Sequence, residues 1–425
     1  MSNKRRAGNI SPPPLKRKVL STTTSATVAN FFKPLSQKEP EKTTWRIVDK
    51  SLLVANYDNK TIPTYSTPRK IAAFDLDSTL IKTSSGATFA KSESDWMWWD
   101  PVVPTKLKEL HSEGRVYNVT IFTNQGGIKL DKPGPKLNIF KLKVSAILSA
   151  LDIPLTLYGA TENDKYRKPR SGMWDKMVDD YGTDIHGLNK EESLLVGDAA
   201  GRDGDFSASD RYFAFNVGIK FHTPEEYFLG HQPKPVKDVF NPTELATPTV
   251  PASAISTKFS KINDPEVVIL VGSPGAGKST FVKRYLAPLG YQRVNQDTLK
   301  TREKCLKTAV EFLGVKKSVV VDATNPDIDT RKRWIGLAKK CAIPIRCVYL
   351  TAPPHICQHN DAVRAFGGDI VNPENRKILP RLAFTGYASR FKEPTLDEGF
   401  LDITKLEFEW EGSETERNIW AKYWS

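Results

Sequence analysis

The chain contains few cysteines, and their spacing is unsuited to metal binding. Its four cysteines, Cys305, Cys341, Cys347 and Cys357, form no CxxC pair, so reduced intracellular thiols are expected rather than a disulfide framework or a zinc site. No apolar run approaches the ~18 residues that cross a bilayer, and no signal-peptide core opens the chain, so no membrane association is expected. The sequence also lacks an internal repeat. With 39% hydrophobic and 26% charged residues in a length of 425, two or three domains with real cores are expected.

Basic residues outnumber acidic ones. The 62 lysines and arginines against 49 aspartates and glutamates give a net charge of +13, which favours a polyanionic partner such as nucleic acid. Over half of this excess is local, because residues 1–42 hold nine basic and two acidic residues, a net of +7. The same stretch is rich in Ser, Thr, Pro and Lys and has no helical or strand periodicity. We therefore predict a disordered basic tail over residues 1–44.

The tail carries two short patterns. The clusters Lys4-Arg5-Arg6 and Lys16-Arg17-Lys18 frame a nine-residue spacer, which is typical of a nuclear-import signal and predicts a nuclear protein. A basic arm that only touches DNA is the alternative. A short apolar group further on resembles the motif by which replication and repair proteins dock on the sliding clamp, although Ser25 stands where that motif has glutamine. This group consists of Val28, Phe31 and Phe32.

The rest of the chain divides into two α/β regions. Apolar, strand-like runs alternate with helix-like segments over residues 45–230 and again over residues 265–425. Residues 231–264 between them are irregular and rich in Pro, Ser and Thr, which is typical of a linker. The sequence therefore predicts an α/β protein with two domains joined by a linker.

The stretch Lys70–Lys82 places two carboxylates at the end of a buried strand. The apolar run from Ile71 to Phe74 predicts a short strand, and Asp75 and Asp77 follow it directly. In open α/β sheets, ligands bind at the carboxyl ends of the strands. Two carboxylates this close repel each other unless a cation lies between them or one carries a proton. The pattern indicates a divalent metal and an aspartyl nucleophile rather than a helix cap alone.

Three later segments supply the remaining groups for phosphate chemistry. Thr123 ends a second apolar run, ahead of the polar and glycine residues 124–127, and a hydroxyl beside exposed backbone amides can cradle a phosphate. Arg167 and Lys168 lie in a loop and could neutralise phosphate charge. Asp198 follows a third strand-like run. Each segment alone has an ordinary explanation, but the four in this order point to phosphoryl transfer.

This set of motifs resembles the haloacid dehalogenase superfamily of phosphatases, over residues 70–220. The resemblance implies that Asp75 attacks phosphorus and becomes an aspartyl-phosphate. It also implies that Asp77 protonates the leaving oxygen and then activates the hydrolytic water. Thr123 and Lys168 are expected to hold the phosphoryl oxygens.

The same resemblance implies a Mg²⁺ site with hard oxygen ligands. Its expected ligands are the carboxylates of Asp75 and Asp198 and the backbone carbonyl of Asp77. The superfamily often has a further acid after its last motif. Three candidates remain open for that position: Asp203, Asp205 and Asp210.

The second α/β region opens with a phosphate-binding loop. An apolar run that ends at Val271 is followed by the pattern GxxxxGK[ST] and a helix-like segment, which is the setting this motif requires. Glycines let backbone amides face the phosphates, Lys278 reaches the β and γ phosphates, and Ser279 places its hydroxyl on Mg²⁺. The expected ATP-binding residues are Gly272, Ser273, Pro274, Gly275, Ala276, Gly277, Lys278, Ser279 and Thr280.

Two acids and several arginines follow this loop. Asp297 comes shortly after the helix of the loop, where it could act as a base near the γ-phosphate, and Asp322 ends another strand-like run. An arginine is expected to form a lid over the transferring group, and Arg364 is favoured. The other candidates, each of which could equally be a surface charge, are Arg302, Arg331 and Arg333.

A phosphatase of this type followed by a P-loop kinase resembles the bifunctional polynucleotide kinase 3′-phosphatases. That family repairs DNA ends by removing a 3′-phosphate and adding a 5′-phosphate. The resemblance implies that Asp297 deprotonates the 5′-hydroxyl, Asp322 positions the DNA end and Arg364 clamps phosphate. Animal members begin with a forkhead-associated module, and the residues before Trp45 are too few for a sandwich of ~100 residues. We expect a monomer, because the sequence shows no coiled-coil seam.

Two alternative functions remain open at this point. An RNA end-healing or small-metabolite kinase–phosphatase would carry the same motif residues, since none of them reads the sugar. A catalytically idle, end-binding scaffold is disfavoured, because every motif residue needed for chemistry is present. A separate choice concerns Trp96, Trp98 and Trp99, which could stack on a nucleotide base but more often form part of a core.

Overall fold

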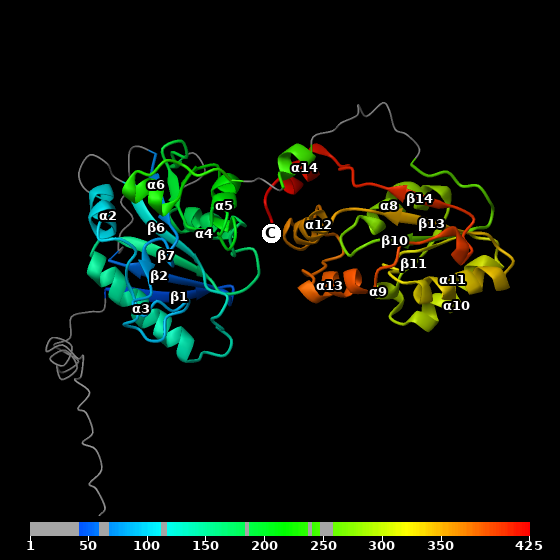
Figure 1. Ribbon diagram of the computed structural model, residues 1–425, viewed down its shortest axis with the longest axis horizontal. Helices are drawn as coiled ribbons and strands as arrows, with labels where there is room; N and C mark the ends of the chain where they lie inside the picture. The colour runs from blue at the N-terminus through cyan, green and yellow to red at the C-terminus, as the bar shows by residue number, and fades with distance from the viewer. Residues whose placement is uncertain (1–41, 59–67, 112–116, 183–186, 237–239, 247–257) are drawn as a thin grey trace, which may run out of the picture. The chain divides into compact units, whose positions relative to one another are not determined.

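The computed structural model describes residues 42–58, 68–111, 117–182, 187–236, 240–246 and 258–425. In these residues the strands form a seven-stranded sheet, a five-stranded sheet and a two-stranded sheet (Figure 1). Residues 1–41 of the predicted basic tail, including its import-like clusters and its clamp-like motif, lie outside the described residues, whereas Thr43 and Thr44 at its predicted end belong to strand β1 (Thr43–Val48). Among the helices that are described, none combines the length and the apolar character needed to cross a bilayer.

The seven-stranded sheet has the strand order β1-β2-β7-β6-β3-β8-β9. Five of its strands, from β7 to β9 in this order, run parallel. Strand β2 pairs antiparallel with β7, and β1 pairs antiparallel with β2. The strands are β1 (Thr43–Val48), β2 (Leu52–Tyr57), β3 (Lys70–Phe74), β6 (Tyr117–Asn124), β7 (Leu155–Ala160), β8 (Leu194–Val196) and β9 (Lys220–His222). The two-stranded sheet pairs β4 (Ile81–Lys82) with β5 (Met97–Trp98).

Helices cover both faces of the seven-stranded sheet. Alternate residues of β3 enter two apolar clusters, Ala72 and Phe74 on one face and Ile71 and Ala73 on the other, so the strand is buried on both sides as parallel strands usually are. The first cluster includes α2 and α3, and the second includes α4 and α5. These helices are α2 (Val103–His111), α3 (Pro135–Leu151), α4 (Gly172–Asp180) and α5 (Ser209–Val217), and α6 (Pro224–Leu229) follows them.

The strand order reverses at β3. The chain passes from β3 to β6 and β7 on one side, and then to β8 and β9 on the other side. The carboxyl ends of β3, β6 and β8 therefore lie together at a topological switch point, where open α/β sheets bind ligands. Residues that follow these three strands converge there although they are far apart in sequence.

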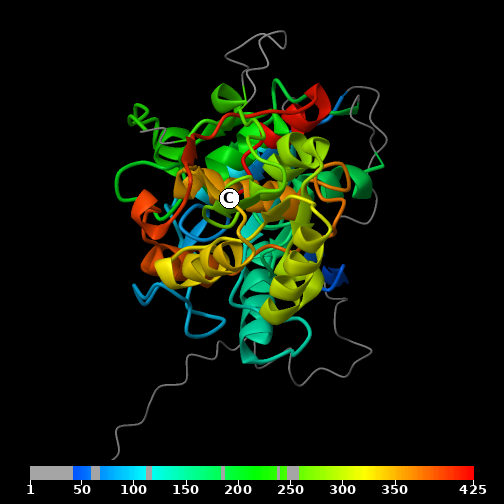
Figure 2. The same cartoon turned by 90° about the vertical axis from the view of Figure 1, so that its right-hand side faces the viewer.

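The five-stranded sheet is entirely parallel, with the order β11-β12-β10-β13-β14. Helices α10 and α11 lie side by side against one face, as Figures 1 and 2 both show. The strands are β10 (Val267–Val271), β11 (Gln292–Val294), β12 (Val319–Val321), β13 (Ile345–Leu350) and β14 (Ile403–Leu406). The helical elements are α7 (Pro242–Leu245), α8 (Lys278–Phe281), η3 (Val282–Leu286), η4 (Ala287–Leu289), α9 (Gln296–Leu299), α10 (Arg302–Gly314), α11 (Ile328–Lys340), α12 (Pro354–Phe366), α13 (Arg381–Arg390), η5 (Leu396–Glu398) and α14 (Glu414–Trp420).

The two-domain α/β architecture predicted from the sequence is confirmed. Strand β10 is the middle strand of its sheet, β3 is the middle one of the five parallel strands of the other sheet, and the P-loop follows β10 directly. Trp96, Trp98 and Trp99 pack against the apolar cluster that contains β3, α2 and α3, which is the core arrangement favoured for them. The stretch predicted as a linker contains one short helix, α7.

Arg331 is a buried structural residue. Its side chain is 0% exposed, and its guanidinium forms a two-point ion pair with Glu398 at 2.8 and 2.6 Å. It also donates to the carbonyl of Lys392 at 2.9 Å. These bonds join α11 to the chain that leads into η5, so Arg331 is not available as a lid over the phosphate loop.

Replacing Arg331 with Met should lower the free energy of unfolding by about 3–5 kcal/mol, because Glu398 would remain as a buried charge without a partner. Urea unfolding followed by circular dichroism measures the loss. The double variant R331M/E398M removes both charges and should recover most of the stability. A single variant no less stable than the double one would contradict this assignment.

Candidate active sites

The first candidate site lies where β3 ends. The backbone N–H of Asp75 donates to the carbonyl of Val196 at 2.9 Å, which extends the pairing of β3 with β8 and fixes the position of this residue. The Asp75 side chain is 11% exposed, whereas that of Asp77 is 51% exposed. The buried carboxylate is placed to contact a phosphoryl group that enters the site. The more exposed one can reach a leaving group or a water molecule.

Lys168 lies at the centre of this site. Its Nζ is 2.7 Å from an Oδ of Asp75 and 2.7 Å from an Oδ of Asp210, and the side chain is 1% exposed. It also donates to the carbonyl of Phe122 at 2.7 Å, so all three of its hydrogens have partners. The side chain of Asn124 bonds both the N–H and the C=O of Lys168, at 3.0 and 3.2 Å. The lysine is therefore fixed at its backbone and at its tip.

Asp210 is the acid that completes the site, out of the three that the sequence left open. It is 2% exposed, and its second oxygen accepts from the N–H of Ala199 at 3.1 Å. Asp205 instead pairs with Arg202 at 2.9 Å, and Asp203 is exposed. Asp210 lies in the first turn of α5, which brings it back to the end of β8.

The charges at the site are not balanced. Burial raises the pKa of Asp75 well above its usual range, with Lys168 opposing the shift and Asp210 and Asp198 adding to it. Burial also raises the pKa of Asp198, to about 6, and Asp210 contributes. Burial alone would lower the pKa of Lys168, but Asp210 and Asp75 outweigh it and raise it. One ammonium therefore faces three carboxylates, and the site can accept further positive charge.

These carboxylates fit a divalent cation. One oxygen each of Asp75, Asp198 and Asp210 lies within 4.8 Å of the other two. Both oxygens of Asp210 already have donors in Lys168 and a backbone N–H, so Asp75 and Asp198 are the better candidate ligands. Thr79 supports Asp198, because its hydroxyl accepts from the Asp198 N–H at 3.1 Å.

Polar groups from β6 and the following turn line the same pocket. Gln125 donates to an Oδ of Asp77 at 2.8 Å and to the Thr123 hydroxyl at 2.9 Å. The guanidinium of Arg167 lies over the glycine turn, since a Cβ on Gly126 would be 3.1 Å from its Nη1. Within the described part of the chain, the Arg167 side chain has no ion pair, so its charge is available to a phosphate. The predicted phosphatase residues thus converge at one place.

The second candidate site is the P-loop between β10 and α8. Gly275 has φ +77°, and a Cβ there would lie 2.0 Å from the carbonyl oxygen of Cys357, so a larger residue cannot fit. Lys278 folds back on the loop, and its Nζ lies 2.8 Å from the Gly272 carbonyl and 2.7 Å from the Ser273 carbonyl. Burial lowers the pKa of Lys278 to about 8, although Asp322 opposes the shift.

Asp322 lies beside the hydroxyl of the P-loop. The Ser279 hydroxyl donates to its Oδ2 at 2.8 Å, and Arg293 approaches the same oxygen at 2.6 Å. The Asp322 side chain is 2% exposed. This position favours a role close to Ser279 and to any cation bound there, whereas contact of Asp322 with a DNA end stays a prediction.

Asn295 couples Asp322 to the candidate base. Its side-chain amide donates to the Asp322 carbonyl at 2.7 Å, and its Oδ1 accepts from the N–H of Asp297 at 2.8 Å as the N-cap of α9. Asp297 is 71% exposed, and Arg376 lies 3.1 Å from its carboxylate. The exposed carboxylate can therefore reach a hydroxyl group while its backbone is fixed.

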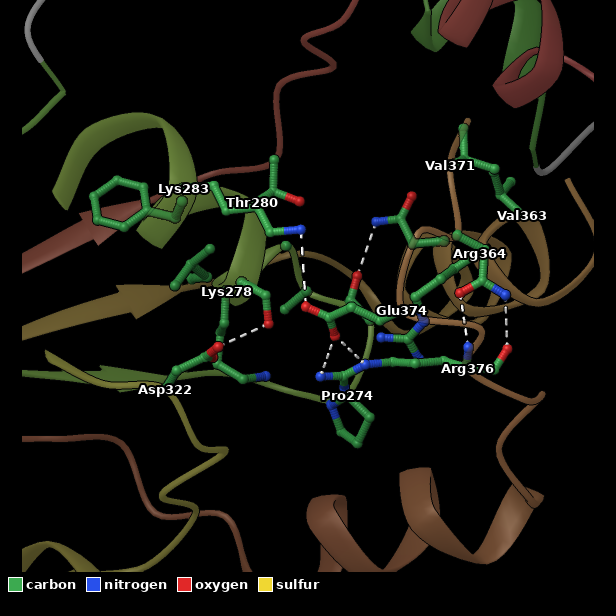
Figure 3. Close-up of a pocket in the computed structure, with 18 of the residues that line it drawn as sticks. Pro274, Lys278, Thr280, Lys283, Asp322, Val363, Arg364, Val371, Glu374 and Arg376 are labelled. Atoms are coloured by element: carbon green, nitrogen blue, oxygen red, sulfur yellow. Dashed lines mark hydrogen bonds and ion pairs between the residues drawn. The ribbon is translucent and has the colours of Figure 1, made fainter. Parts of the chain in front are cut away.

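A cavity of about 1560 Å³ extends from the P-loop past Asp297 to the segment that follows α12. Figure 3 shows Arg364, Glu374 and Arg376 at this cavity, opposite the loop. Asp361, which is 1% exposed, pairs with Arg364 and also accepts from the Leu379 N–H at 2.8 Å. Glu374 is surrounded by cations, namely Arg376 at 2.7 Å, Arg293 at 3.5 Å and Lys283 at 3.8 Å.

Several supporting residues were not identified from the sequence. Asn295 had a usable signal, since an asparagine before Gln-Asp-Thr is typical of a helix cap. The others reach their sites through tertiary packing and have no local pattern. They are Thr79, Asn124, Gln125, Arg293, Asp361, Glu374 and Arg376.

Comparisons with known proteins agree with this arrangement. A family model described as "Polynucleotide kinase 3 phosphatase" matches residues 70–228, and one described as "AAA domain" matches residues 267–394. A bifunctional polynucleotide phosphatase/kinase of Schizosaccharomyces pombe is 42% identical, over 86% of this chain and 84% of its own length. A relative from Acanthamoeba polyphaga mimivirus, provisionally given the same description, is 32% identical over 85% of this chain and 90% of its own length. A solved HAD-like phosphatase from Mesorhizobium loti aligns with a TM-score of 0.31 and 16% identity, over 42% of this chain and 80% of that one.

The two sheets and the residues at their carboxyl ends define a two-domain enzyme, in which a haloacid dehalogenase-like phosphatase is joined to a P-loop kinase. The kinase fold implies use of a nucleotide such as ATP. The similarity covers more than four-fifths of the length of both relatives. The chain therefore belongs to the family of bifunctional polynucleotide phosphatase/kinases.

Gly197→Ala should impair the phosphatase by about 10²-fold, because small misplacements at a reacting centre have effects of this size. A Cβ on Gly197 would lie 2.4 Å from an oxygen of Asp210, so this carboxylate would move and release Lys168. Phosphate release from a 3′-phosphorylated oligonucleotide measures the effect. Gly336→Ala, where a Cβ meets nothing within 4 Å, is the matched control. Equal activity of both variants would contradict the packing argument.

ATP binding should take up a proton near pH 8. The pKa of Lys278 in the free kinase is about 8, and bound phosphates favour the charged form and raise it. Affinity should therefore fall as pH rises, by about tenfold between about pH 7 and pH 9 if only the charged form binds. Calorimetry in buffers of different ionisation enthalpy measures the proton uptake. The control variant Lys283→Met should show the same uptake. An enthalpy independent of the buffer would rule out this linkage.

Proposed function

We propose that this chain heals broken DNA ends, by removing 3′-phosphates at the Asp75 site and phosphorylating 5′-hydroxyls with ATP at the P-loop site. The proposal is supported by one observation: one chain of this family brings together two sets of residues suited to phosphate chemistry, each at the switch point of its own sheet. In one, Lys168 is buried among carboxylates. In the other, Lys278 is buried under a large open cavity.

The phosphatase reaction would take place in two steps. An oxygen of Asp75 attacks phosphorus, the bond from phosphorus to the 3′-oxygen breaks, and Asp77 gives its proton to that oxygen. Asp77 then takes a proton from water, which attacks the aspartyl-phosphate and releases inorganic phosphate. Lys168, Thr123 and Arg167 would hold the phosphoryl oxygens, since a buried cation and hydrogen-bond donors stabilise the developing charge.

Mg²⁺ is the proposed metal of this site. The residues that would hold it are Asp75 and Asp198, through carboxylate oxygens, and Asp77, through its backbone carbonyl, in keeping with the hard oxygen donors that Mg²⁺ prefers. When bound, it would screen the charge between the nucleophile and the phosphoryl group. The surplus of negative charge described above supports this assignment.

The kinase reaction would need one proton transfer. Asp297 takes the proton of a 5′-hydroxyl, the oxygen attacks the γ-phosphorus of ATP, and ADP leaves with the bridging oxygen. Lys278 and the P-loop amides would hold the β and γ phosphates, and Arg364 would neutralise charge from the opposite wall. Ser279 would hold a second Mg²⁺, with Asp322 beside it.

The setting we propose for this activity is the repair of DNA breaks in the nucleus, by a monomer. The net charge of +13 suits a nucleic-acid substrate, and the basic clusters of the tail suit nuclear import. Docking on the sliding clamp through Val28, Phe31 and Phe32 is part of the same proposal.

Separate variants should remove the two activities one at a time. On a nicked duplex with 3′-phosphate and 5′-hydroxyl termini, Asp75→Asn should abolish release of the 3′-phosphate, because an amide cannot form the aspartyl-phosphate. Its ATP-dependent 5′-phosphorylation should stay within about twofold of the wild type. Lys278→Ala should show the reverse pattern, with phosphorylation lost by at least about 10²-fold.

Loss of both activities in either folded variant would refute the two-site account. Competition between 3′-phosphorylated DNA and RNA oligonucleotides tests the choice of nucleic acid. Preference for RNA would overturn the DNA assignment and leave the chemistry in place.

A further inference from the structure

Lys143 is a charged residue on the apolar face of α3. The buried positions of this helix are Leu137, Phe140, Lys143, Val144, Ile147, Leu148 and Leu151. They recur at the spacing of a single helix face, which packs on the sheet beside β3. Lysine is almost never buried without a specific partner, and the Lys143 side chain is only 8% exposed. An apolar residue is expected at this buried position of the helix, but the sequence has a lysine there.

The partner of Lys143 is the carboxylate of Asp77. Its Nζ lies 3.2 Å from Oδ1, while Gln125 donates to Oδ2 at 2.8 Å. The two donors come from different elements, α3 and the turn after β6. Each oxygen of the carboxylate therefore has its own donor, and rotation of the group about its χ angles is restricted.

Packing does not explain this lysine. Burying a cation has a large desolvation cost, and the Asp77 carboxylate, which is half exposed, returns little of it because solvent screens the pair. Methionine or leucine on the same helix face would bury apolar surface without that cost. A residue that reduces stability at its own position is expected to serve the site it faces.

We propose that Lys143 is a positioning residue of the phosphatase, which with Gln125 aims the Asp77 carboxyl at the leaving 3′-oxygen and at the hydrolytic water. The inference rests on the proposed function, because it needs Asp77 as the group that transfers the proton. Asp77 is one of two exposed residues in the short stretch between β3 and β4, so packing alone does not fix its side chain. The helix α3 supplies a rigid support for it.

Lys143→Met keeps the length of the side chain and removes the charge. The variant should fold at least as stably as the wild type, because the half-exposed Asp77 stays hydrated and no buried charge is left unpaired. Its single-turnover rate on a 3′-phosphorylated oligonucleotide should fall by about 10- to 100-fold, a part of what general acid catalysis contributes. The KM should stay within about twofold of the wild type.

A second substrate distinguishes the positioning of the Asp77 carboxyl from other effects of the Lys143 substitution. The nitrophenolate of p-nitrophenyl phosphate leaves readily without a proton, so its first-turnover burst does not need Asp77 as an acid. That burst should change by less than about threefold in Lys143→Met, whereas the later steady-state rate should fall, because Asp77 still has to activate water. Lys143→Arg, which restores a cation, should recover part of the rate on the oligonucleotide.

Lys141→Met is the matched control. Lys141 lies on the same helix, is partly exposed and rests over the ring of Trp45 at 5.4 Å, and its loss should leave both substrates unaffected. The 5′-kinase activity of all three variants should also be unchanged.

Three results for Lys143→Met would overturn the inference. The first is an equal loss of first-turnover rate on both substrates, and the second is no loss of rate at all. The third is a rise in KM alone, which would indicate that Lys143 contacts DNA. If the wild type releases no phosphate from the oligonucleotide, the proposed function fails instead. The two failures are therefore distinguishable.

Discussion

The phosphatase site depends on one buried ammonium group shared by three parts of the chain. Lys168 joins the end of β3 through Asp75, the strand β6 through a backbone carbonyl, and α5 through Asp210. Carboxylates at such distances would otherwise repel one another or take up protons. The lysine reduces that repulsion and leaves the site accessible, since Asp77 remains half exposed. The remaining negative charge favours the binding of a divalent cation, which would help to keep Asp75 ionised.

In the kinase site, hydrogen bonds rather than a shared cation hold the acidic residues in position. Asn295 bonds the backbone at Asp322 and caps the helix that carries Asp297. Asp322, beside the P-loop hydroxyl, and the candidate base Asp297 therefore belong to one rigid unit, although they lie 25 positions apart in the sequence. Fixed positions matter in phosphoryl transfer, because most of the catalysis comes from alignment and charge stabilisation.

Sequence reasoning predicted the fold class, which is confirmed, and the candidate phosphate-site residues, which the structure brings close together, because both have local signals. Apolar runs followed by Asp, Thr or glycine mark strand ends, and strand ends of an open sheet converge. It did not choose Asp210 over its neighbours, because the choice depends on the path of the chain from β8 into α5. Lys143 was missed because a lysine within a helix is normally a surface residue, so the sequence gives no sign that this one is buried. Arg331 could not be separated from the other arginines until its burial was known.

The ion pairs of Glu374 affect which anions the kinase pocket can bind. It acts as a tethered counter-ion, held by Arg376, Arg293 and Lys283 beside the P-loop. A free inorganic phosphate that enters the pocket must compete with this carboxylate for the same cations, and it carries fewer charges for that competition than a nucleoside triphosphate does. A nucleoside triphosphate, with several charges and the P-loop amides to grip it, can displace the carboxylate. We therefore expect the pocket to favour anions of higher charge before any base or sugar is recognised.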